Sequence, residues 1–128
     1  MRQPGLCDDF LVTRVLVVDD HAGFRASART LLELDGFDVV AEAADGATGL
    51  ELAGRIGPDV VLLDVALPDT SGFEVAERLR GGRSKVILIS SRDPRDFGRR
   101  VRRSGAVGFL SKDRLSGAAV RALLEESR

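Results

Sequence analysis

The chain has 128 residues, of which 44% are apolar and 30% charged, and its net charge is −1. These values are typical of one globular domain with its own core, and they give no general electrostatic footprint for nucleic acid or a membrane surface. The single cysteine, Cys7, excludes an intrachain disulfide, and no apolar run approaches the roughly 18 residues of a membrane span, so we expect a cytoplasmic protein.

Strand-like and helix-like patterns alternate along the chain after an N-terminal arm, which we place at residues 1–13. In chain order, strands are predicted at 15–18, 37–43, 60–63, 86–89 and 107–110, and each is followed by a helix, at 22–34, 47–56, 73–79, 94–103 and 115–126. Asp45 and Asp93 can cap the second and fourth helices, and Gly36 can take the left-handed conformation after the first. Right-handed crossovers then place helices on both faces of a parallel sheet.

Polar side chains follow the apolar runs at four strand ends. Asp19 and Asp20 follow the first strand, Asp64 the third, Ser90 the fourth and Lys112 the fifth. Ligands of open parallel sheets bind at the edge where the carboxyl ends of the strands meet. We therefore expect these five side chains to converge at that edge.

Three carboxylates at one edge need a positive counter-charge, because one like-charge pair at about 4 Å costs roughly 4 kcal/mol at an effective dielectric of about 20. Carboxylate ligands completed by water suit Mg²⁺, and Lys112 supplies a further positive charge. A cation beside a carboxylate and an ammonium is a suitable place for phosphoryl transfer, in which an aspartate can itself be the nucleophile. The pattern therefore predicts Mg²⁺-assisted chemistry through an aspartyl phosphate.

Four motifs contain these strand-end residues: VLVVDDH (15–21), DVVLLDVALPDTSG (59–72), VILISS (86–91) and SGAVGFLSKD (104–113). Each is modest alone, but the four in this order closely resemble the receiver domain of two-component response regulators. The resemblance covers residues 14–128. It implies an α/β fold, namely a doubly wound (βα)5 flavodoxin-like parallel sheet with strand order 2-1-3-4-5.

The resemblance also implies how the acids act. Asp64 is expected to accept a phosphoryl group from the phosphohistidine of a sensor histidine kinase. Asp20, Asp64 and the backbone carbonyl of Ala66 are expected to ligate Mg²⁺ directly, whereas Asp19 is expected to hold the ion mainly through water.

Three further residues take roles from the same resemblance. Lys112 is expected to pair with Asp64 at rest and with a phosphate oxygen afterwards, Ser90 to hydrogen-bond the phosphate, and Phe109 to act as the aromatic switch. Asp113 stands where the family usually has proline. Lysine followed by aspartate, together with histidine after the acidic pair, resembles the branch that carries LuxR-type DNA-binding domains.

The implied function is a phosphorylation-dependent switch of a protein-interaction surface, not an enzyme with an external product. Its output is expected to be transcription regulation through an output domain absent from this chain. The alternative is a stand-alone receiver that acts by protein–protein contact. We expect no direct DNA contact from this chain and no membrane partner. A homodimer could form through Val120, Leu123 and Leu124 of the last helix, unless these form only its core face.

Other functions fit the residues less well. A phosphohydrolase that uses an aspartyl phosphate needs a second aspartate two residues after its nucleophile, where this chain has Ala66. A flavin-binding module needs a phosphate loop rich in Ser, Thr or Gly after the first strand, where DDHAG places two negative charges. A degenerate receiver used as a scaffold would not need the intact acids and lysine. We interpret His21 as a solvated loop residue, and the arginines of the fourth helix as a solvated face.

Overall fold

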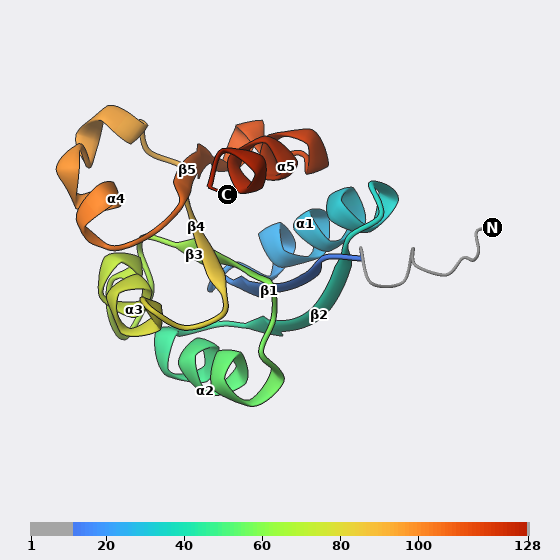
Figure 1. Ribbon diagram of the computed structural model, residues 1–128, viewed down its shortest axis with the longest axis horizontal. Coiled ribbons are helices and arrows are strands. Elements are labelled where there is room, and N and C mark those ends of the chain that lie inside the picture. The colour runs from blue at the N-terminus through green and yellow to red at the C-terminus, as the bar shows by residue number, and fades with distance from the viewer. Residues whose placement is uncertain (1–11, 128) are drawn as a thin grey trace.

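The computed structural model describes residues 12–127, so the arm predicted at 1–13 lies almost wholly outside the described residues, as does Cys7. One parallel sheet forms the centre of the fold (Figure 1). Its strands are β1 (Arg14–Val18), β2 (Asp38–Ala43), β3 (Val60–Asp64), β4 (Lys85–Ser90) and β5 (Gly108–Ser111). They lie in the order β2-β1-β3-β4-β5, which confirms the predicted topology.

Helices cover both faces of this sheet. They are α1 (Ala22–Leu34), α2 (Gly46–Ile56), α3 (Gly72–Leu79), α4 (Arg99–Arg103) and α5 (Gly117–Glu126), with two 3-10 turns, η2 (Pro94–Asp96) and η3 (Lys112–Arg114). Figure 1 shows α1 and α5 on one side of the sheet and α2 and α3 on the other. The predicted doubly wound arrangement is therefore confirmed.

Each strand contributes to two cores because its side chains alternate between the faces. Val17 and Leu62 pack with Leu32 of α1 on one face, whereas Leu16 and Leu63 pack with α2 and α3 on the other. All four of these strand side chains are fully buried. This double burial explains the continuous apolar runs in the sequence.

Local signals at the helix ends behave largely as predicted. Asp45 caps α2 by accepting a hydrogen bond from Thr48 N at 2.7 Å, and Gly36 takes a left-handed φ of 91° after α1. The last helix begins at Gly117 rather than at residue 115. Its first turn is capped by Ser116, whose Oγ accepts from Ala119 N at 3.0 Å.

The continuous fourth helix predicted over residues 94–103 is wrong. Gly98, at a φ of 48°, separates the turn η2 from the five-residue helix α4. Asp93 accepts from Arg95 N at 2.8 Å and so caps only the short turn. The chain breaks here because Phe97 is drawn into the core, where its ring packs against Phe73.

The proposed dimer residues of α5 face the protein's own core. Val120 is fully buried, and Leu123 and Leu124 pack against the same cluster. The reading of these residues as a core face is therefore the correct one. Among the helices described between residues 12 and 127, none has the length and apolar character needed to cross a bilayer.

Candidate functional site

The first and third strands bring two carboxylates together at the carboxyl edge of the sheet. Asp64 is the last residue of β3, and Asp19 directly follows β1, which pairs with β3 up to the register Val18 with Leu63. The backbone N–H of Asp19 donates to Ala43 O at 2.9 Å and so continues the sheet by one residue. Asp19 is 0% exposed and Asp64 3% exposed. The sequence-predicted acids are thus a buried pair.

Lys112 reaches these acids from the end of β5, which is an outermost strand of the sheet. It begins η3 immediately after β5, and its Nζ lies 2.7 Å from Asp19 Oδ2 and 3.2 Å from Asp64 Oδ2. The ammonium also lies over the ring of Phe24, 4.7 Å from its centroid. Lys112 lies 48 residues from Asp64 along the chain. The fold, not sequence proximity, brings the two together.

The environment shifts the pKa of both charged partners. Burial raises the pKa of the Asp64 carboxyl, the Ala66 N–H that donates to its Oδ1 at 3.2 Å opposes this, and the negative charge of Asp19 raises it further. Burial alone would lower the pKa of Lys112, but its contacts with Asp19 and Asp64 outweigh burial, and its pKa lies above the ordinary value. Lys112 is therefore a charged ammonium shared by two acids.

The acids also fit a bound cation. Carboxylate oxygens of Asp19, Asp20 and Asp64 lie within 4.8 Å of one another, together with a ring nitrogen of His21. Asp19 Oδ2 is buried, and the Lys112 ammonium lies 2.7 Å from it. A buried anionic oxygen of this kind favours a positive ligand. The pocket is therefore compatible with a metal site.

His21 is closer to the site than the sequence indicated. Its side chain is 67% exposed, as expected for a loop residue, yet its Nδ1 lies 3.1 Å from Asp19 Oδ1 and 3.1 Å from Asp20 Oδ1. Its backbone N–H also donates to Asp19 Oδ1 at 2.8 Å. His21 is therefore a solvated loop residue, as interpreted, whose ring also contacts both acids. Its position directly after the acidic pair was the available signal.

Ser90 and Phe109, at β4 and β5, make their contacts away from the acids in the part of the chain that the structure describes. Ser90 is buried at the end of β4, and its Oγ accepts from Arg92 N at 3.0 Å. Phe109 is half-buried on β5 and packs against Phe97, with ring centroids 5.4 Å apart. The aromatic ring is thus directed toward the segment that contains α4.

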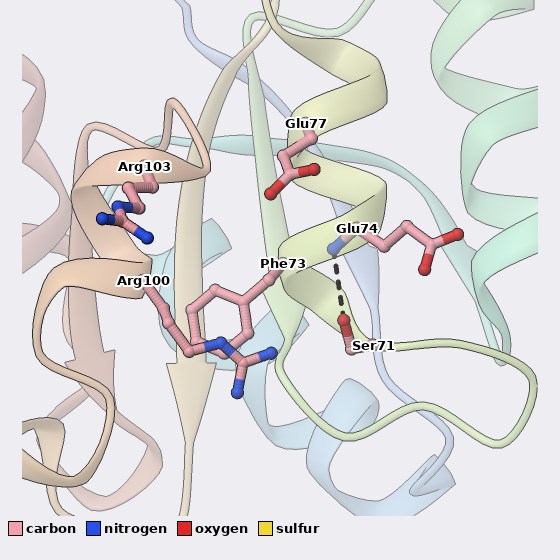
Figure 2. Close-up of a pocket in the computed structure, with 6 residues that line it drawn as sticks. All are labelled: Ser71, Phe73, Glu74, Glu77, Arg100 and Arg103. Carbon is pink, nitrogen blue, oxygen red and sulfur yellow. Dashed lines mark hydrogen bonds between the residues drawn. The ribbon is translucent and has the colours of Figure 1, made fainter.

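A groove of about 390 Å³ lies between α3 and α4, and it contains none of the acids (Figure 2). It is lined by Ser71, Phe73, Glu74, Glu77, Arg100 and Arg103. Glu77 and Arg103 face each other across it, whereas Glu74 points away from α4. The Arg100 guanidinium lies 4.3 Å from the centroid of the Phe73 ring. This mixture of charges indicates no single class of ligand, so the acid pocket remains the candidate site.

The sequence matches the response regulator receiver domain family over residues 15–123. The chain belongs to this family. The receiver domain is 41% identical over 103 residues to the nitrate/nitrite response regulator protein NarP of Escherichia coli, covering 78% of this chain and 48% of NarP. It is 32% identical over 113 residues to the transcriptional regulatory protein DegU of Brevibacillus brevis, covering 86% of this chain and 48% of DegU. The chain therefore spans about half the length of these curated relatives.

Solved structures agree with this assignment. The receiver domain superimposes on the signal receiver domain of NarL from Mycobacterium tuberculosis with a TM-score of 0.80 and 39% identity, covering 89% of this chain and 94% of that one. A LuxR-family response regulator from Aurantimonas sp. SI85-9A1 gives a TM-score of 0.79 and 30% identity, covering 90% and 84%. The predicted family, its flavodoxin-like fold and its likeness to the LuxR branch are confirmed.

Proposed function

We propose that this receiver domain accepts a phosphoryl group on Asp64 from the phosphohistidine of a sensor histidine kinase. The buried contact of Asp64 with Lys112, beside Asp19, carries this proposal. A carboxylate oxygen of Asp64 attacks phosphorus, the phosphorus–nitrogen bond of the donor breaks, and the donor nitrogen keeps the electron pair. The product is an aspartyl phosphate, and the domain turns over no external substrate.

Mg²⁺ is the proposed cofactor of this transfer. Asp20, Asp64 and the backbone carbonyl of Ala66 would ligate it, and Asp19 would hold it mainly through water. When bound, the ion neutralises charge on the transferring phosphoryl oxygens. The mutual proximity of the acid oxygens supports this assignment, as does the burial of Asp19, whose negative charge favours a nearby cation.

Lys112 and Ser90 are the proposed partners of the phosphate once it is attached. The Lys112 ammonium already contacts Asp64 Oδ2, so a phosphoryl oxygen added there would meet a positive charge at short range. Ser90 Oγ accepts its hydrogen bond from Arg92 N, which leaves the hydroxyl proton available for donation to that phosphate. Both residues would therefore favour the phosphorylated state.

Phe109 is the proposed aromatic switch between the phosphate and the surface. It packs on Phe97, which in turn packs on Phe73 of α3. The adjoining helix α4 has five residues, no buried residue and no side-chain cap. A helix with so few stabilising contacts can be repositioned at low free-energy cost, so the phosphate would shift the population of conformations there.

We propose transcription regulation as the output, through a part of the protein outside residues 14–128. The arm at 1–13 would precede the receiver domain. The names of NarP, a response regulator protein, and DegU, a transcriptional regulatory protein, support this output.

Intact-mass spectrometry after incubation with acetyl phosphate and Mg²⁺ tests the acceptor. We expect one added phosphoryl group per chain, its loss on treatment with hydroxylamine, and no labelling when a chelator replaces Mg²⁺. Asp64→Asn should abolish labelling. Asp59→Asn is the matched control, because Asp59 precedes the same strand at its opposite end, where it accepts from Arg14 N at 2.8 Å. Undiminished labelling of Asp64→Asn would show that another residue is the acceptor.

A further inference from the structure

The His21 ring is held against two of the proposed metal ligands. Its Nδ1 lies 3.1 Å from one oxygen of Asp19 and 3.1 Å from one oxygen of Asp20. The His21 backbone N–H bonds to the same Asp19 oxygen at 2.8 Å, which fixes the start of the side chain beside the acids. The backbone of His21 is therefore fixed beside the acids, within reach of its ring.

These separations match the ligand spacing of a small octahedral cation. Metal–ligand distances of about 2.1 Å place adjacent octahedral ligands about 3 Å apart. The distance from Nδ1 to Asp20 Oδ1 has this length, so one cation could contact both atoms, with Asp19 beside it. Asp64 contributes another oxygen within the same 4.8 Å cluster.

We propose that His21 Nδ1 is a ligand of this cation site, and that it shifts the site's preference from Mg²⁺ toward divalent first-row transition ions such as Mn²⁺ and Ni²⁺. This inference rests on the proposed cation site. Imidazole nitrogen suits transition ions, whereas Mg²⁺ prefers oxygen ligands and retains water. The ring coordinates in its neutral form, and any proton on Nδ1 passes to solvent when the ion binds.

The competing account makes His21 a cationic partner of the acids only while no metal is bound. In that case an incoming ion displaces the ring, which is exposed enough to swing into solvent. The two accounts differ in where the ring lies when the site is loaded. That difference can be measured directly.

Pulsed electron paramagnetic resonance of the untagged protein loaded with Mn²⁺ tests the contact. His21 is the only histidine of the chain, so an imidazole nitrogen coupled to the ion has one possible source. We expect a nitrogen-14 coupling in the wild type and its loss in His21→Asn. Asn suits an N-cap, so this substitution preserves the start of α1 and offers oxygen in place of nitrogen. A loaded wild type without nitrogen coupling overturns the inference.

Competition titrations provide the second measurement. The ratio of Ni²⁺ to Mg²⁺ association constants should fall on the order of tenfold or more in His21→Asn, because one nitrogen ligand is lost. An unchanged ratio also overturns the role of His21. If the wild type binds neither ion, the proposed cation site is wrong as well. If the wild type binds ions through oxygen ligands without a nitrogen coupling, only the proposed role of His21 is wrong.

Discussion

Lys112 contacts Asp19 more closely than it contacts the proposed acceptor, with its Nζ 2.7 Å from Asp19 Oδ2. Both acids are buried, so this one ammonium balances two carboxylates. Its removal would leave their charges uncompensated. The structure therefore makes Lys112 important for stability as well as for the proposed chemistry.

We expect Lys112→Met to lower the free energy of unfolding by about 3 kcal/mol without divalent cations, because breaking one side of a buried ion pair leaves unpaired charge. Millimolar Mg²⁺ should restore part of that loss. Urea unfolding with and without the ion measures both effects. Lys85→Met is the control: Lys85 bonds to Ser127 Oγ, away from the acids, and it should show no Mg²⁺-dependent recovery.

Asp64→Asn should stabilise the cation-free protein at pH 7. Burial, the first cause, raises the pKa of Asp64 above its ordinary 3.8, so protonation of this group favours the fold. That contribution is present below about pH 3.8 and is lost as pH rises through the higher folded pKa. The advantage of the variant should therefore shrink as pH falls. Unfolding curves of both proteins, recorded with a chelator from neutral to acidic pH, measure this difference in the free energy of unfolding. A difference that stayed constant with pH would contradict the prediction.

Glu42 should show the opposite pH dependence. Its carboxylate pairs with Arg29 Nε at 2.8 Å and Arg25 Nε at 3.1 Å. The hydrogen bond from Arg29, the largest cause, lowers the pKa of Glu42 below its ordinary 4.5. Stabilisation is therefore present above about pH 4.5 and is lost as pH falls through the lower folded pKa. Glu42→Gln should cost about 1 kcal/mol at pH 7 and little at strongly acidic pH, as measured by urea unfolding.

Gly72 should tolerate no side chain. A Cβ there would lie 2.9 Å from both the Asp64 carbonyl carbon and Val65 Cα, which are backbone atoms that cannot turn aside. Gly72→Ala should cost about 2 kcal/mol and should also slow labelling of Asp64. At Gly54, inside α2, a Cβ meets nothing within 4 Å, so Gly54→Ala should stabilise by about 0.5–1 kcal/mol. Thermal unfolding of the two variants compares these opposite signs directly.

The sequence predicted the elements that depend on local pattern. The alternation of apolar runs and helical periods gave the sheet and its helices, and polar residues at strand ends gave the convergence of Asp19, Asp64 and Lys112. The break at Gly98 could not be predicted in this way, because it follows from the burial of Phe97 by tertiary packing. The contact of His21 with both acids also depends on side-chain geometry, which residue spacing does not specify.

Because the acids and Lys112 all gather at the carboxyl edge of the sheet, the opposite edge is free for protein engineering. The turn between α3 and β4 contains Gly81 and Gly82, both exposed. New chain termini or a fused reporter placed there would leave the strand ends that carry the acids intact. A circular permutant opened at this turn would therefore show whether the pocket forms without the native order of the strands along the chain.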